Sequence, residues 1–115
     1  MTNESEIDFI SHVSRLLREV LEVGYKFSLL TMLEDKIERG AAIERVTYTR
    51  RHIPRCVSYG WSAFCGGVKL AMIGRWAEAF DVFEEAAAQF SQSPDHQELV
   101  WAVRDMVAEL KSLTV

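Results

Sequence analysis

Residues that interrupt helices are scarce in this chain. Among 115 residues there are two prolines and six glycines, so few positions break regular secondary structure. Valine, isoleucine and threonine do not form long clusters, whereas alanine, leucine, glutamate and arginine are abundant, and this balance favours helices over strands. The length suits one domain. We therefore expect an all-α protein of about five helices in a single domain, residues 1–115.

Cysteines and long apolar runs are also few. Two cysteines, Cys56 and Cys65, do not make a disulfide framework. The longest stretch without a charged residue, residues 56–68, is rich in glycine and serine, and it is too short and too polar to cross a membrane. The N-terminus is acidic and polar, unlike a secretory signal or a transit peptide. We expect a cytoplasmic protein with reduced thiols and no membrane partner.

Signatures of catalysis and of ligand binding are missing as well. His52, Cys56 and Cys65 offer too few ligands at the wrong spacing for zinc, which commonly takes four ligands in close pairs. No local signature supports a Cys–His nucleophile pair, and no glycine-rich phosphate loop is present. Adjacent acidic residues are typical of solvated helix surface. We expect no enzyme activity, no metal site and no cofactor.

Apolar spacing in the N-terminal third predicts two helices joined as a hairpin. Over residues 6–23 apolar side chains recur at helical spacing on one face, and Gly24 ends the first helix. The pattern resumes and continues until Gly40, which is expected to be the C-cap of the second helix. The hairpin is thus predicted over residues 6–39. A single long helix bent at Gly24 is the alternative, because one glycine costs only ~1 kcal/mol inside a helix.

The segment that follows, residues 41–57, is basic and harder to assign. We favour a helix that ends before Pro54, because the residue before a proline disfavours helical ψ. The alternative is a strand, since residues 46–49 alternate between apolar and polar. Residues 39–75 hold seven basic residues and one acidic residue, whereas both flanking thirds are acidic. We treat residues 41–57 as a basic connecting segment.

This basic segment carries most of the candidate binding residues. Arginine and aromatic side chains are favoured anchors at protein interfaces, so we expect a protein partner with an acidic surface. The candidates are Arg45, Arg50, Arg51, Arg55, Tyr59 and Trp61, together with Trp101 in the last helix. Two alternatives remain open. The acidic C-terminal helices could neutralise the segment internally, or the segment could bind nucleic acid, which the net charge of −4 disfavours.

Three further helices are predicted in the second half. A helix pair is expected over residues 58–92 with its turn at Gly74, and a last helix over residues 95–113. Gly66-Gly67 inside the first of these helices should allow a neighbouring helix to approach closely. Ser93 is expected to be the N-cap of the last helix, with a proline at its first position. Trp101 lies off the apolar stripe of that helix.

Residues 60–93 resemble one unit of the tetratricopeptide repeat, a helix–turn–helix of about 34 residues. The positions that carry the resemblance are Gly67, Leu70, Gly74, Trp76, Glu78, Ala79, Phe83 and Ala86. The sequence departs from the repeat at Ala63, at Gly66 and in its late proline, Pro94. The helix that starts at Asp95 resembles the capping helix at the end of a repeat stack.

The resemblance implies a non-catalytic interaction protein: an adaptor, an inhibitor, or a secretion chaperone similar to the TPR-like chaperones of bacterial type III secretion. We expect an apolar groove, or the Trp101 side of the last helix, to receive a partner helix or a second copy of the chain as a homodimer. One alternative is a small inhibitor or antiactivator that blocks a transcription factor or a defence complex. The other is a nucleic-acid-binding regulator that uses the arginine-rich middle.

Overall fold

Five α-helices and one short 3₁₀ helix make up the fold. The computed structural model describes residues 6–24, 27–51 and 54–114, and the side chains of residues 43–51 are not described. The elements are α1 (Glu6–Val23), α2 (Phe27–Arg51), α3 (Arg55–Met72), α4 (Trp76–Ser91), η1 (Pro94–His96) and α5 (Gln97–Thr114). No strand occurs in these described ranges, so the all-α prediction is confirmed.

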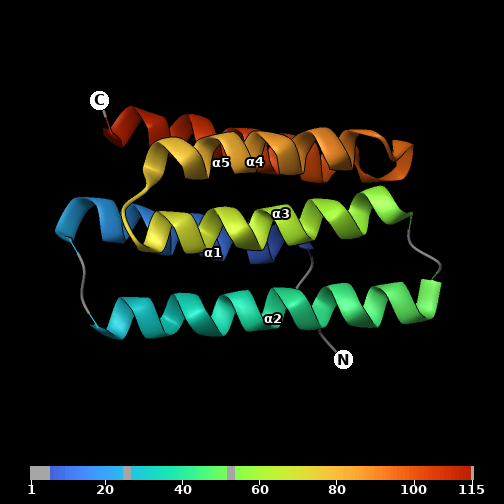
Figure 1. Cartoon of the computed structure of the whole chain (residues 1–115), viewed down its shortest axis with the longest axis horizontal. Coiled ribbons are helices and arrows are strands. Elements are labelled where there is room, and N and C mark those ends of the chain that lie inside the picture. Colours follow the sequence, from blue (N-terminus) through green and yellow to red (C-terminus); the bar gives the residue numbers. More distant parts are fainter. Residues whose placement is uncertain (1–5, 25–26, 52–53, 115) are drawn as a thin grey trace.

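Four of the helices form a bundle, and α2 lies outside it. In the bundle α3 packs on α4, α4 on α5, and α5 returns to pack on α1, which also touches α3. The remaining helix, α2, packs against α1 and α3. Figure 1 shows α2 on the side of the molecule away from α4 and α5. The molecule thus has a four-helix bundle with one additional helix on its outer face, and that helix adds Leu29, Leu33 and Ile37 to the same hydrophobic core.

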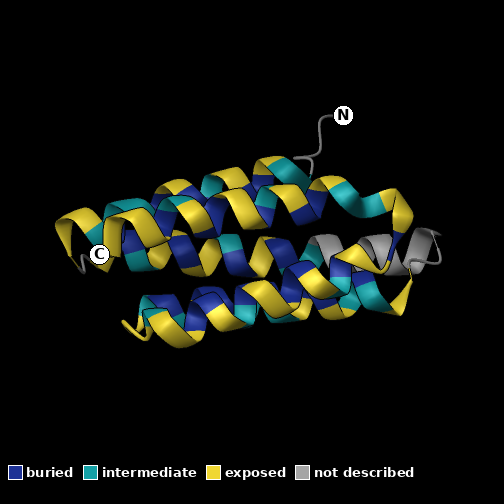
Figure 2. Ribbon diagram, turned by 90° about the horizontal axis from the view of Figure 1, so that it is seen from above, coloured by how far each residue is buried: buried dark blue, intermediate teal, exposed yellow. Residues whose placement is uncertain are grey.

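The centre of the bundle is a cluster of aromatic rings. Phe9, Trp61, Phe64, Phe83 and Phe90 are all buried, and neighbouring ring centroids lie 5.3–5.8 Å apart in edge-on or tilted arrangements. Such pairs add about 0.5–1.5 kcal/mol each beyond the burial of their area. Figure 2 shows the buried residues of the bundle helices turned toward one another. One aromatic cluster therefore ties together α1, α3 and α4.

Two glycines of α3 lie directly against phenylalanine rings of α4. A Cβ atom added to Gly67 would lie 2.6 Å from Phe83, and one added to Gly60 would lie 2.5 Å from Phe90. Both distances are far below van der Waals contact, so only glycine lets the two helices approach this closely. Close approach at Gly67 confirms the prediction. At Gly66 the nearest atom is 3.8 Å away, so that glycine has no such role.

The second helix is longer than the sequence indicated. Gly40 lies inside α2, which continues to Arg51, so the predicted C-cap at Gly40 is wrong. A Cβ atom on Gly40 would lie 2.5 Å from the ring of Phe9, which means that this glycine serves a contact with α1. The favoured helical assignment of residues 46–49 is confirmed. Residues 41–51 of the predicted connecting segment form the last turns of α2, and residues 55–57 begin α3. Residues 52–53 lie outside the described residues.

The junctions at Gly24 and Gly74 are as predicted. Both glycines have a positive φ, +79° and +82°, which residues with a side chain rarely adopt. The N–H of Gly24 donates to the carbonyl of Val20 at 2.9 Å and ends α1. At the end of α3, Gly74 donates to Ala71 and Arg75 to Leu70, both at 3.0 Å, which is a Schellman motif. The packing of α1 on α2 and of α3 on α4 agrees with two helix hairpins, but the first extends beyond its predicted limit at residue 39.

The last junction differs in detail from the prediction. Pro94 opens the 3₁₀ helix, and Ser93 precedes it, but the Ser93 side chain makes no capping bond to the backbone. Instead its hydroxyl is hydrogen-bonded to Nδ1 of His96 at 2.7 Å. The side-chain amide of Gln97 donates from Nε2 to the backbone carbonyl of Ser93 at 3.0 Å. The 3₁₀ helix runs without a gap into α5, with Ser93 as the extended N-cap residue and Pro94 in the first turn. The predicted positions of the N-cap and the proline are therefore confirmed, and only the capping bond of the serine side chain is missing.

Candidate functional site

One of the predicted binding residues belongs to the core. Trp61 is 2% exposed and lies among the rings of Phe9, Phe64 and Phe90. Its indole N–H donates to Oε1 of Glu6 at 3.0 Å, as a buried tryptophan requires. A partner protein cannot reach this side chain in the folded state. Its assignment as a binding residue is therefore wrong.

The other aromatic candidates are exposed but lie apart. Tyr59 is 57% exposed and Trp101 is 63% exposed. Tyr59 is on α3 and Trp101 on α5, two helices that are not packing neighbours in the bundle. Trp101 does lie off the buried stripe of α5, as predicted, since that stripe is formed by Leu99, Val103 and other residues. The two side chains do not form one surface.

The arginine candidates sit on two helices. Arg55 is exposed at the first position of α3. The side chains of Arg45, Arg50 and Arg51 lie outside the described residues. Their helix, α2, packs against α1 and α3 on the far side from α4 and α5 (Figure 1). α2 thus lies away from the acidic C-terminal helices, whereas Arg55 belongs to α3, which packs on α4.

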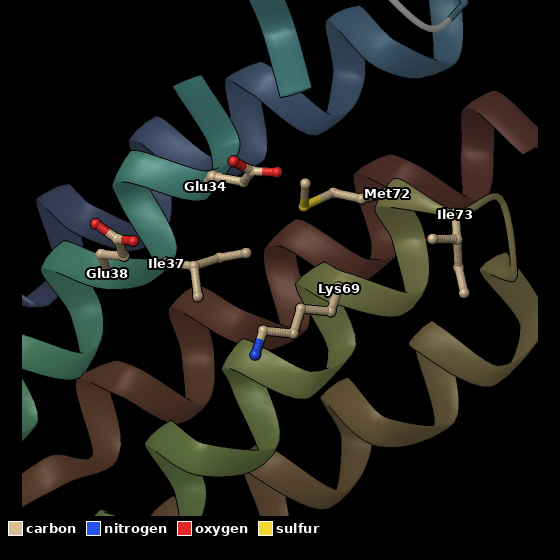
Figure 3. Close-up of a pocket in the computed structure, with 6 residues that line it drawn as sticks. All are labelled: Glu34, Ile37, Glu38, Lys69, Met72 and Ile73. Carbon is tan, nitrogen blue, oxygen red and sulfur yellow. The ribbon is translucent and has the colours of Figure 1, made fainter. Parts of the chain in front are cut away.

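An open groove lies between α2 and the end of α3. Its volume is about 400 Å³, and the residues that line it are Glu34, Ile37 and Glu38 from α2, and Lys69, Met72 and Ile73 from the end of α3. Figure 3 shows Ile37 pointing from α2 toward α3 and Met72 pointing back toward α2. We refer to this feature as the α2–α3 groove.

The α2–α3 groove has an apolar floor that is partly open to solvent. Ile37 is 9% exposed, Met72 is half-buried, and Ile73 is 64% exposed. Ile73 is the C-cap of α3, and the Schellman turn after it directs the chain away to α4. Phe27, 87% exposed, lies two helical turns before Glu34 and so on the same face of α2. Phe27 thus adds a separate exposed apolar side chain near the start of α2, on the helix face that carries Glu34.

Charged side chains form the rim of the groove. Glu34 and Glu38, one turn apart on α2, lie on one side, and Lys69 lies on the other side (Figure 3). None of the three forms an ion pair with another residue of the described ranges. The nearest lysine on α2, Lys36, is hydrogen-bonded to Nδ1 of His12 on α1 at 2.9 Å. Both charged residues of α2 that line the groove are thus acidic, although the exposed Arg39 directly follows Glu38 in the helix.

Sequence reasoning did not find this groove. Glu34 and Asp35 are adjacent acidic residues of the kind typical of solvated helix surface, and Met72 follows the apolar spacing of its helix. The groove exists because α2 and α3 run side by side in opposite directions, which no local pattern reveals. One signal was available at Ile73, a large apolar residue that lies outside the predicted stripes and next to the glycine junction at Gly74. Phe27 belongs to the apolar pattern that predicted the second helix, but its side chain is 87% exposed.

Metal ligands, thiols and membrane-spanning helices are the other features that could indicate a function. Among the described residues, no three His, Cys, Asp or Glu side chains gather in a way that could hold a metal ion. Cys56 and Cys65 are not joined by a disulfide bond, and both are partly buried. In the part of the chain that the structure covers, no helix has the length and apolar character needed to span a bilayer.

Comparisons with known proteins leave the groove as the main functional indication. No protein-family model matches the chain, and searches of the curated proteins and of the solved structures found no significant match. A function must therefore be inferred from the surface that the helices present.

Proposed function

We propose that this is a non-catalytic protein-binding protein that receives an amphipathic helix of a partner in the α2–α3 groove. The observation that carries the proposal is the apolar floor of Ile37, Met72 and Ile73 between two helices. Grooves of this kind bind helices that insert apolar side chains at i, i+3, i+4 and i+7. Methionine suits such a surface, because its flexible thioether adapts to differently shaped side chains.

The exposure of the apolar residues supports binding of a protein over binding of a small molecule. Pockets for small ligands bury most of the ligand surface, whereas Ile73 and Phe27 stand out at 64% and 87% exposure. Exposed apolar side chains that adjoin one another on a surface mark interaction sites. A helix laid along α2 would cover the groove and could also reach the exposed Phe27 side chain, two turns before Glu34.

The packing of α5 on α1 closes the bundle, and this limits which surfaces are open to a partner. In a linear repeat array each unit contacts only its neighbours, and the stack presents a concave surface to a partner. Here α5 packs on α1, so the helices form a closed bundle with no such stack. The TPR-like pair α3–α4 would then contribute to binding through the end of α3. Adaptor, chaperone and inhibitor roles are all compatible with this surface.

Photo-crosslinking tests the proposal. A benzophenone amino acid replaces Ile73 in one variant and Trp101 in another, since the two side chains are equally exposed, 64% and 63%. We expect Ile73 to cross-link one amphipathic segment of one protein in the native cell, and the additional change Met72→Asp to abolish the product. Trp101 should give no such product. A discrete product from Trp101 alone would place binding on α5 and contradict the proposal.

A further inference from the structure

The charges around the α2–α3 groove specify its partner more closely. Resting on the proposed function, we infer that the partner helix is cationic along one edge, with basic side chains that meet Glu34 and Glu38. These two carboxylates stand four residues apart on α2, about 6 Å along the helix axis. Basic residues one turn apart on the bound helix would match them.

The acidic side of the groove is available to a partner. Both glutamates are exposed, and neither forms an ion pair in the described ranges. Asp35, also exposed, adds a third negative charge on the same turn of α2. Lys36 is bonded to His12 on the side that faces α1, so it does not neutralise the carboxylates at the rim. A cationic helix would be attracted before contact and held after it.

Lys69 would determine the direction in which the partner helix lies in the groove. It stands on the α3 side of the groove, across the apolar floor from the glutamates (Figure 3). A helix that is basic on both edges would bring like charge to Lys69, and like charges in an interface disfavour the wrong partner. The preferred partner is therefore basic on the edge next to α2 and neutral or acidic on the other edge, which fixes one of the two directions in which it can lie.

Designed peptides test the inference. The probe is a dye-labelled helical peptide of about four turns with Leu and Met at i, i+3, i+4 and i+7 and lysines along one edge. In the matched peptide, glutamates replace these lysines. We expect wild-type protein to bind the lysine peptide roughly tenfold more tightly at low salt, because two exposed ion pairs each contribute a few-fold. The preference should shrink as salt is raised.

A charge reversal sharpens the test. Glu34→Lys with Glu38→Lys should reverse the peptide preference. The control is Asp81→Lys with Glu85→Lys, the same change at the same spacing between exposed residues of α4, which should leave the preference unchanged. Circular dichroism checks that each variant is helical.

The outcomes separate the two proposals. If both peptides bind equally and Met72→Asp abolishes their binding, the groove binds helices but the inferred partner charge is wrong. If neither peptide binds, or if Met72→Asp has no effect, the proposed function fails and the inference fails with it. If sedimentation shows a dimer that Glu34→Lys with Glu38→Lys disrupts, the occupant is a second copy and the inference is overturned.

Discussion

The α3–α4 pair and α2 show two different ways of holding a helix in one small protein. The pair is in contact along its length, with glycine–phenylalanine contacts at Gly67 and Gly60 and a Schellman turn between the helices. The longest helix, α2 with 25 residues, packs only from one side, on α1 and α3. The longest helix is therefore not the one with the most packing partners. A helix in a protein is stabilised mainly by the apolar face that it buries, and length alone does not provide this.

The largest expected effects come from placing an aspartate in the bundle that contains α3 and α4 and, separately, in α2. Val103 on α5 and Leu33 on α2 are both fully buried. Val103→Asp places an unpaired charge in the bundle and should lower the free energy of unfolding by about 4 kcal/mol or more, which unfolds the protein. Leu33→Asp should release α2 and leave the bundle helical. Circular dichroism and hydrogen exchange measure the two results.

The exchange pattern decides the outcome of that experiment. In the Leu33→Asp variant, amides of α2 should lose protection while those of α3 and α4 keep theirs, because locally unfolding units exchange independently of the global transition. If α3 and α4 lose protection together with α2, the bundle depends on α2, and the distinction between core and outer helix is wrong.

Two neighbouring glycines offer a smaller and sharper test. Gly67→Ala would bring a methyl group within 2.6 Å of Phe83, and overpacking of this kind costs about 1–3 kcal/mol. Gly66→Ala meets nothing closer than 3.8 Å and should stabilise the protein by up to ~1 kcal/mol through helix propensity. Thermal or urea unfolding compares the two. Equal effects of both substitutions would show that the close approach of α3 and α4 is not the reason for Gly67.

The smallest expected effect concerns the contact that closes the bundle. Arg18 on α1 and Glu109 on α5 form an ion pair in which both side chains are about two-fifths exposed. Solvent screens such a pair, so Arg18→Met should lower the free energy of unfolding by less than about 1 kcal/mol. The matched variant Arg75→Met breaks a pair with Glu78 inside one turn of chain and should cost less still. A larger loss for Arg18→Met would mean that the ion pair, and not apolar packing, holds α5 on α1.

The sequence was sufficient for the elements with strong local patterns. The period of the apolar residues predicted α1 and α5, and the glycines at positions 24 and 74 marked the ends of α1 and α3. The prediction of a helix end at Gly40 is wrong. The sequence alone does not distinguish a glycine that ends a helix from a glycine inside a helix that leaves room for an aromatic ring of a neighbouring helix. The ring that packs against Gly40 belongs to Phe9, which is distant in the chain.

The binding surface was harder to predict for the same reason. Trp61 and Tyr59 are both aromatic and close in sequence, yet Trp61 is buried and Tyr59 is exposed, because they point to different sides of α3. The α2–α3 groove depends on Ile37 meeting Met72, a juxtaposition of two helices. Local patterns identify which face of a helix is apolar, but they do not identify its neighbour.

The contact between α1 and α5 has a consequence for how this fold could change in evolution. Open helical arrays lengthen by duplication, because each new pair of helices finds an unoccupied face at the end of the stack. In this protein α5 already occupies the corresponding face of α1. A duplicated pair would have to displace α5. We therefore expect this fold to diversify through substitutions of surface residues. Such substitutions should disturb the bundle least in the outer helix α2.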